Sequence, residues 1–241
     1  MIDAPPLILL APSEDKASGG HPGRLRETAA QRWVREGLVD LAENGTAQAQ
    51  QRAFAVKGLA LERARADALA LQGRLPLLPA LERYTGVAFR ALDPLSLPRP
   101  RWHQICVLSS LRGLVRGDEP VPSYKLKLGG LPGLKAHWRE HLPKALEKLG
   151  EGTVWDLLPG EHASLLEGWV RPRHSLVILE GDGRAITHFS KHYRGLVARW
   201  LLEHQTGDPR RILRGRIPGC VWEGATENPT GGVSLVLRRK P

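Results

Sequence analysis

The chain has 241 residues, of which 41% are hydrophobic and 25% are charged, a composition close to that of ordinary globular domains. No run of about 18 apolar residues and no basic, apolar leader occurs, which argues against a membrane-spanning helix and a secretory signal. The net charge is +10, and a basic surface of that strength makes a polyanion the natural partner, although a merely solubilising surface is an equal alternative.

The first half of the chain alternates one apolar run with helical segments. Leu7 to Leu10 form a short apolar run that predicts a buried strand, followed by a polar, glycine-rich loop over 13–24. Apolar spacing then predicts a helix over 26–43 and a second over 47–72, which Gly58 interrupts. A short helix over 80–84 follows, and the prolines within 93–102 indicate a rigid connector.

The second half mixes strands and helices more evenly. We expect strands over 105–108 and 233–237, a hairpin of 175–179 with 184–189 around Gly-Asp-Gly, and helices over 133–149 and 192–205. The mixture predicts an α+β or mixed α/β fold. We expect one domain over 1–241, because the helices need sheet surface to cover them.

Positive charge is concentrated in two stretches that are separated in the sequence. Residues 99–148 and 191–241 each carry 10 basic and 4 acidic side chains, whereas residues 149–190 are net negative. If folding brings the two stretches together, they form one basic cleft, and nucleic acid is the partner that such a cleft predicts. Most of the 7 tryptophans lie in apolar helical patterns, which weakly favours duplex backbone contacts over base stacking.

Four polar segments are candidate anion sites. Ser13 and Lys16 follow the first strand, where loops often line ligand crevices; their Ser-x-x-Lys spacing also occurs in acyl-transfer enzymes, but the partner motifs are absent. A turn after the strand over 105–108 carries serines and two arginines, which suit an anion. The Leu-Pro-Gly-Leu turn over 131–134 faintly resembles the hairpin of a helix-hairpin-helix element. The fourth segment is 188–199, where basic side chains share a helix start. Ordinary charged loops and turns are the alternative in every case.

Metal and cofactor chemistry have little support. Cys106 and Cys220 are too few for a disulfide framework or a four-cysteine zinc site, and we expect both to be reduced in a cytoplasmic protein. The 9 histidines are scattered, with no His-x-x-x-His and no Cys-x-x-Cys. Glu161 beside His162 suggests a ligand pair, yet a glutamate at a helix start is usually a cap. We predict no metal and no cofactor.

Six segments, taken in order, resemble the YaaA peroxide-stress protein family over residues 7 to about 240. They are LLAPSEDK at 9–16, YTGVAFRAL at 84–92, LSSLRGLVR at 108–116, YKLKLG at 124–129, DLLPGE at 156–161 and SKHYRG at 190–195. The chain departs from the family pattern at Arg112 for Tyr, Gly117 for Pro, Ser123 for Pro, Lys125 for Arg, His162 for Tyr and Ser164 for Lys. It therefore looks like a diverged member.

The resemblance implies a mixed α/β fold with a central mixed sheet, flanking helices and a basic cleft. It also implies a helix-hairpin-helix-like element, double-stranded DNA binding and protection from hydrogen peroxide. The residues that fall on motif positions are Ser13, Lys16, Ser109, Arg116, Tyr124, Lys125, Glu161, Lys191, Arg194 and Arg199.

The leading hypothesis is a cytoplasmic protein that binds double-stranded DNA, or another phosphate-bearing ligand, without sequence specificity. The predicted anion-binding residues are Ser13, Lys16, Ser109, Arg112, Arg116, Tyr124, Lys125, Lys127, Lys191, Arg194 and Arg199. The alternative is an enzyme acting on a nucleotide or other small anionic metabolite, with Lys16, Glu161 and Lys191 as catalytic candidates. A third possibility is an interaction protein whose basic surface binds acidic proteins.

Overall fold

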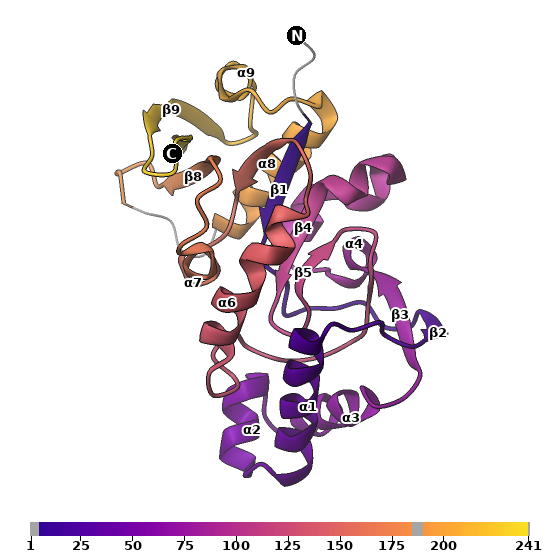
Figure 1. The fold of residues 1–241 in the computed structure, drawn as a ribbon. Coiled ribbons are helices and arrows are strands. Elements are labelled where there is room, and N and C mark those ends of the chain that lie inside the picture. The colour runs from indigo at the N-terminus through magenta and orange to yellow at the C-terminus, as the bar shows by residue number, and fades with distance from the viewer. Residues whose placement is uncertain (1–4, 185–189, 241) are drawn as a thin grey trace.

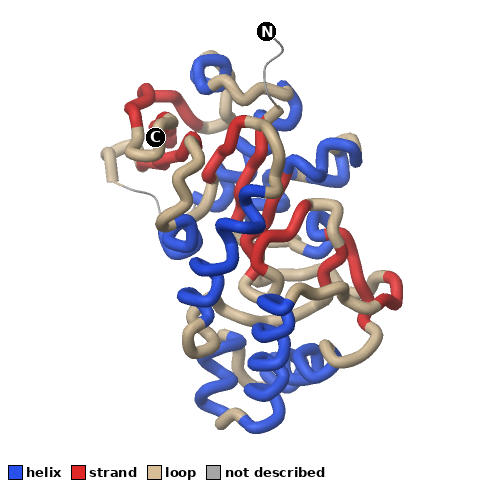
Figure 2. Tube along the Cα trace, viewed as in Figure 1, coloured by secondary structure: helices blue, strands red, loops and turns tan. Residues whose placement is uncertain are grey.

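A seven-stranded mixed sheet forms the centre of the molecule in the computed structural model, which describes residues 5–184 and 190–240 (Figures 1 and 2). The strand order is β5-β4-β1-β7-β8-β10-β9. The bounds are β1 Pro6–Leu10, β4 Ile105–Ser109, β5 Gly113–Arg116, β7 Thr153–Asp156, β8 Arg173–Leu179, β9 Cys220–Glu227 and β10 Val233–Arg239. The predicted mixed α/β fold with a central mixed sheet is confirmed.

The inner strands are parallel and the two edge strands are antiparallel. β1 pairs in parallel with both β4 and β7, and β8 pairs in parallel with β7 and β10. β5 and β9 close the edges in antiparallel register against β4 and β10. All residues of β1 and β4 are buried, because a parallel strand covered on both faces requires a continuous apolar run. That is why these two strands could be predicted from sequence.

Helices cover the sheet on both sides. In Figure 1, α6 (Leu134–Glu147) crosses in front of the sheet and α8 (Ser190–His204) lies behind β1. α8 also packs against α5 (Val87–Leu92). Shorter elements complete the coverage: α4 Ala80–Arg83, α7 Gly160–Ala163, α9 Pro209–Leu213 and the 3-10 helices Pro94–Ser96, Arg99–Gln104 and Ser164–Leu166.

Three further helices stand together at the end of the molecule away from both termini (Figure 1). They are α1 (Ala29–Asn44), α2 (Ala47–Phe54) and α3 (Leu59–Ala70). Thr28 and Gln31 form a capping box at the start of α1, and Gly45 follows its end. Gly58 has φ +57°, a conformation that glycine adopts without steric cost. It separates α2 from α3, as the sequence predicts.

Two features of the fold differ from the sequence predictions. Segment 113–116 is the edge strand β5, where we expected only a turn, and residues 75–79, for which we predicted no element, form β3 (Leu75–Pro79). β3 pairs with β2 (His21–Gly23) and β6 (Pro120–Val121) in a small second sheet. Strands this short carry too few residues for an alternating pattern to be detected. The predicted hairpin forms its turn, with Glu180 N–H donating to Arg184 O at 2.8 Å, but residues 185–189 lie outside the described residues.

Close contact between α5 and α8 depends on Gly195. A Cβ at this position would lie 2.1 Å from the Ala88 carbonyl oxygen and 2.8 Å from the Ala91 Cβ. We expect Gly195→Ala to lower the free energy of unfolding by about 1–3 kcal/mol, because the helices must separate to relieve the overlap. Urea denaturation measures this. Gly73→Ala is the control, because a Cβ at Gly73 would meet only the Ala70 carbonyl oxygen, at 3.7 Å; equal stability of the two variants would contradict the prediction.

Candidate anion-binding site

Three loops meet at the carboxyl edge of the central strands. Because β1, β4 and β7 are parallel neighbours, the loops that follow them leave the sheet on the same side. These loops begin at Ala11, Ser110 and Leu157. The chain crosses from β4 on one side of β1 to β7 on the other, and such a change of direction opens a crevice where α/β proteins bind ligands.

Two adjoining pockets occupy this edge. The first has a volume of about 150 Å³ and lies between the loop after β1, the start of α5 and α8. The second, about 280 Å³, lies between the same loop, the end of α2, residues 124–128 and the loop after β7. Lys191 lines both pockets. Eight candidate residues from the sequence line one or both of them: Ser13, Lys16, Tyr124, Lys125, Lys127, Glu161, Lys191 and Arg194. We call the two pockets together the carboxyl-edge groove.

Lys16 is a partly buried lysine in the larger pocket. Its ammonium donates to the Ser13 carbonyl oxygen at 2.9 Å and lies 4.1 Å from the centre of the Tyr124 ring. Among the described residues it forms no ion pair with a carboxylate. Burial, and then the charge of nearby Lys125, lower the pKa of Lys16 from 10.5 to about 7. This lysine is therefore substantially neutral at physiological pH.

Buried hydroxyl groups lie beneath Lys16. The hydroxyl of Tyr124 is 3.0 Å from that of Tyr84 and 2.8 Å from Oγ of Ser109. Burial raises the pKa of both tyrosines, so both stay neutral near pH 7. Ser109 also accepts the Arg112 N–H at 3.0 Å. Of these two predicted anion-binding residues, Tyr124 lines the larger pocket, and Ser109 supports it from the buried side through the hydroxyl hydrogen bond.

Arg83 fixes the loop that carries Lys16, and sequence reasoning missed it. The fully buried guanidinium donates to four backbone carbonyl oxygens, those of Ala17, Gly19, Pro76 and Val121. This one side chain therefore bonds the loop at 17–19 to both β3 and β6 of the small sheet. Nothing in the local sequence distinguishes Arg83 from a surface arginine at a short helix.

Ser13 also has a structural role. Its hydroxyl donates to the Asp15 carbonyl oxygen and accepts the Gly86 N–H at 3.0 Å. Lys16 bonds the Ser13 carbonyl, not its hydroxyl. This arrangement does not provide the serine–lysine pair that an acyl-transfer nucleophile requires, because no base among the described residues contacts the Ser13 hydroxyl oxygen.

The remaining charged groups of the larger pocket come from separate segments. Lys125 donates to the Glu14 carbonyl oxygen at 2.7 Å, while Lys127 and Lys191 are exposed. Glu161 forms an ion pair with Lys135 at 2.8 Å, and this hydrogen bond lowers the pKa of Glu161. A carboxylate held in that state is a weak proton acceptor near pH 7.

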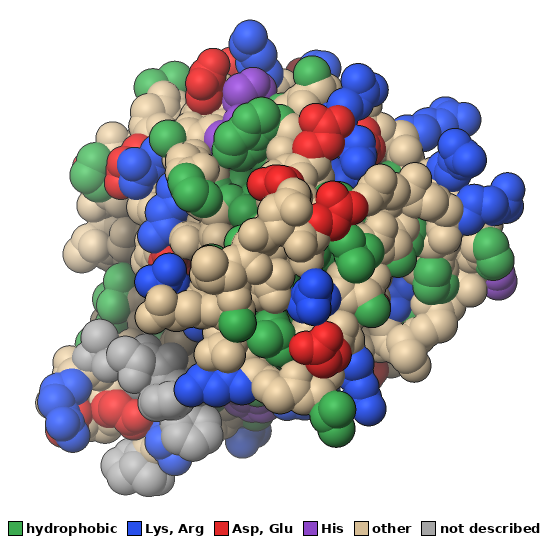
Figure 3. All heavy atoms as spheres, turned by 90° about the horizontal axis from the view of Figure 1, so that it is seen from below, with side chains coloured by type: hydrophobic (Ala, Val, Ile, Leu, Met, Phe, Trp, Pro, Cys, Tyr) green, Lys and Arg blue, Asp and Glu red, His purple; other side chains and the backbone are tan. Residues whose placement is uncertain are grey.

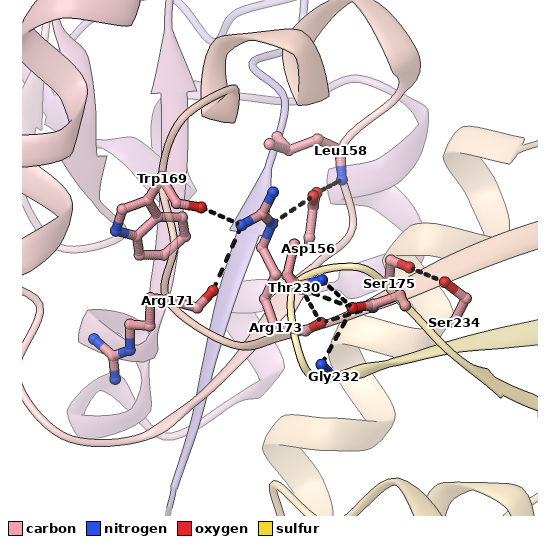
Figure 4. A network of polar contacts seen from close by, with 10 residues as sticks. Asp156, Leu158, Trp169, Arg171, Arg173, Ser175, Thr230, Gly232 and Ser234 are labelled. Carbon is pink, nitrogen blue, oxygen red and sulfur yellow. Dashed lines mark hydrogen bonds and ion pairs between the residues drawn. The ribbon is translucent and has the colours of Figure 1, made fainter.

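Arg194 lines the smaller pocket beside the end of β7. Its Nε and Nη1 are buried without hydrogen-bond partners among the described residues. Burial lowers the pKa of Arg194, and the charge of Asp156 partly offsets that effect. Figure 4 shows how Asp156 is fixed: it accepts the Leu158 N–H at 3.0 Å and pairs with Arg173 at 3.6 Å. This network positions the start of the loop that leads to Glu161.

Four predicted anion-binding residues do not line the carboxyl-edge groove. One of them, Ser109, contacts it only through the hydrogen bond to the Tyr124 hydroxyl. Arg112 and Arg116 line a different groove of about 490 Å³, between α1, β5 and α6, together with Lys144 and Lys148. Arg199 donates to the carbonyl oxygens of Leu92 and Asp93 and pairs with Glu203 at 2.8 Å. It therefore ties α8 to the segment after α5.

The order of secondary-structure elements does not support the expected helix-hairpin-helix element. The element before the turn at 131–133 is the strand β6, and the fully described segment 117–133 contains no helix. On the face that Figure 3 shows, lysine and arginine side chains form separate patches with acidic side chains between them. On this face the positive charge is therefore divided into local clusters.

Metal-ligating clusters and membrane-spanning helices are absent from residues 5–184 and 190–240. That part of the chain holds no group of three or more His, Cys, Asp or Glu side chains able to bind a metal ion. None of its helices is long and apolar enough to cross a bilayer. Cys106 and Cys220 are free and buried, and burial raises the pKa of Cys106 to about 12.

The fold and site define a mixed α/β protein with a lysine-lined groove at the carboxyl edge of its sheet. The family described as peroxide stress protein YaaA matches residues 7–223. A UPF0246 protein of Corynebacterium glutamicum is 31% identical over 257 residues, covering 96% of this chain and 99% of that protein. A UPF0246 protein of Streptomyces coelicolor is 35% identical over 217 residues, covering 81% and 82%. The chain belongs to the YaaA family of peroxide stress proteins.

Proposed function

We propose that this chain is a cytoplasmic protein that binds double-stranded DNA without sequence specificity, as part of protection against hydrogen peroxide. The observation that supports it is the meeting of Lys16, Lys125, Lys127 and Lys191, from three distant segments, around one groove. Family membership supports the stress role. A duplex is too wide for a pocket of about 280 Å³, so DNA would lie across the rim with phosphates facing the exposed Lys127 and Lys191.

Salt dependence of binding tests this proposal. The logarithm of affinity falls against the logarithm of salt concentration by about 0.9 per neutralised phosphate. We expect Lys127→Ala combined with Lys191→Ala to reduce that slope by about 1.8, measured by fluorescence anisotropy with a labelled duplex. The matched control is Lys144→Ala with Lys148→Ala, which removes the same charge from the other groove.

The control pair also tests whether DNA binds to the other groove instead. If only the Lys144 and Lys148 pair changes the slope, the DNA surface is the groove that contains Arg112 and Arg116, and the carboxyl-edge assignment fails. If the wild-type chain does not bind a duplex at low salt, DNA binding itself is refuted.

An enzyme acting on a small anionic metabolite is the second candidate. The observation that favours it is a lysine of pKa about 7 in a pocket of metabolite size. Lys191→Ala and Arg194→Ala, assayed both for DNA binding and for metabolite-induced thermal shift, separate the two functions. Loss in the first assay alone supports DNA, and loss in the second alone supports the metabolite.

A further inference from the structure

We propose that Lys16 is a nucleophile that forms an imine with an aldehyde or ketone carbon carried close to a phosphate, bound in the carboxyl-edge groove. This inference deepens the proposed function and rests on it, because it assigns chemistry to the same groove. It names a covalent step that phosphate binding alone does not require.

The position of Lys16 suits a nucleophile. Its amine lies in the pocket of about 280 Å³, whose walls include the apolar side chains of Phe54, Val56 and Leu126. It is held by one carbonyl oxygen, at 2.9 Å, and by the face of the Tyr124 ring. No carboxylate among the described residues pairs with it, so losing its proton breaks no ion pair.

The amine is available in its reactive form. Only a neutral amine attacks a carbonyl carbon, and an ordinary lysine is less than about one part in a thousand neutral at pH 7. Burial and the charge of Lys125 bring the pKa of Lys16 to about 7, so about half of the molecules carry a neutral amine there.

The cations around Lys16 define the ligand class. Lys125, Lys127 and Lys191 line the same pocket and would hold a phosphate within a few atoms of the Lys16 amine. A phosphorylated small aldehyde has this chemistry. So does the ring-opened deoxyribose of an abasic site, which carries an aldehyde between two phosphates and leaves the duplex stack easily.

The reaction is balanced without a redox partner. The Lys16 nitrogen forms a bond to the carbonyl carbon, and the carbonyl oxygen takes up a proton to give a carbinolamine. That oxygen then leaves as water while the nitrogen loses its remaining proton, which leaves a carbon–nitrogen double bond. The imine is hydrolysed by the reverse path, and added hydride converts it into a stable secondary amine.

Reductive trapping tests the proposal. The full chain is incubated at pH 7 with sodium cyanoborohydride and one of four probes: glyceraldehyde 3-phosphate, glyceraldehyde, a duplex with one abasic site, or an intact duplex. Intact mass and peptide mapping locate any adduct. We expect Lys16 to be labelled at least about tenfold more than any other lysine, and the phosphorylated aldehyde to react at least about tenfold faster than glyceraldehyde.

The first and third probes distinguish the sources of the ligand. Trapping of glyceraldehyde 3-phosphate alone indicates a small metabolite, and preferential trapping of the abasic duplex indicates damaged DNA. Lys16→Met should lose the adduct, whereas Lys144→Met, which removes a lysine of α6 in the other groove, should retain it. Circular dichroism and thermal melting of both variants check that they are folded.

The proposal is overturned if no probe labels Lys16 above the other lysines, or if Lys16→Met leaves the yield of adduct unchanged. Binding of the intact duplex without reductant is measured on the same samples. Duplex binding without trapping refutes the imine and leaves DNA binding standing. Trapping of the small aldehyde without duplex binding refutes DNA binding and supports the imine.

Discussion

Arg83→Met is expected to lower the free energy of unfolding by about 3–5 kcal/mol. Arg83 is fully buried and satisfies four carbonyl oxygens, of which two belong to the loop at 17–19 and two to the strands β3 and β6. Methionine fills a similar volume but donates no hydrogen bond. Each buried carbonyl oxygen left without a partner costs about 1–3 kcal/mol, partly recovered because the buried charge is removed as well.

Urea denaturation followed by circular dichroism measures the effect of Arg83→Met. The matched control is Arg99→Met, because the Arg99 side chain is 69% exposed and forms an ion pair with Glu82; we expect a change within about 0.5 kcal/mol. Arg83→Lys should recover only part of the loss, because an ammonium cannot reach four separated carbonyl oxygens. Equal stability of Arg83→Met and Arg99→Met would show that the buried guanidinium does not hold the loop.

Lys16→Met is expected to stabilise the protein at pH 6 by up to about 3 kcal/mol, with an advantage that disappears as the pH rises. The pKa of Lys16 is about 7 in the folded chain, against 10.5 for an unperturbed lysine side chain. Below pH 7 both states are protonated, so the cost of burying the charge is fully present; each unit of the difference corresponds to about 1.4 kcal/mol. The lost contacts with Tyr124 and the Ser13 carbonyl reduce the net gain.

The pH dependence follows from proton binding. Between pH 7 and about 10.5 the unfolded chain holds a proton on Lys16 that the folded chain has released, so wild-type stability rises with pH in this window. Lys16→Met lacks this contribution. Melting temperatures of wild type, Lys16→Met and Lys144→Met at pH 6 to 10 measure it, at about 2–4 °C per kcal/mol. A difference between wild type and Lys16→Met that stays constant with pH would mean that Lys16 titrates like an ordinary lysine.

The sequence was most informative where a residue pattern strongly favours one local structure. The apolar run at 7–10 predicted the buried strand β1, and Gly58 marked the break between α2 and α3. The pairing of β5 with β4 could not be predicted, because a four-residue edge strand depends on its neighbour for its hydrogen bonds. The same holds for the small sheet of β2, β3 and β6.

The clustering of positive charge in the sequence identified lysines and arginines as candidate site residues, but it did not show where they lie in the fold. Lys16 lies in the loop after β1, and Lys191 lies in the first turn of α8. Lys125 and Lys127 follow β6 of the small sheet, and only the tertiary fold brings these three segments to one groove. Arg112, Arg116 and Arg199 carry the same charge, but they line another groove or bond the backbone elsewhere. Side chains with the same charge thus differ in role, because the fold decides whether each one faces a groove or bonds backbone carbonyl oxygens.

The sequence by itself determined the fold class, the family resemblance and the cationic character of the chain, because composition and local periodicity are properties of neighbouring residues. Only the tertiary structure decided which lysines share a groove, that Arg83 is buried beneath the loop, and that the pKa of Lys16 falls to about 7. Burial and the electrostatic field at a side chain depend on residues distant in the chain, and these are brought together only by folding.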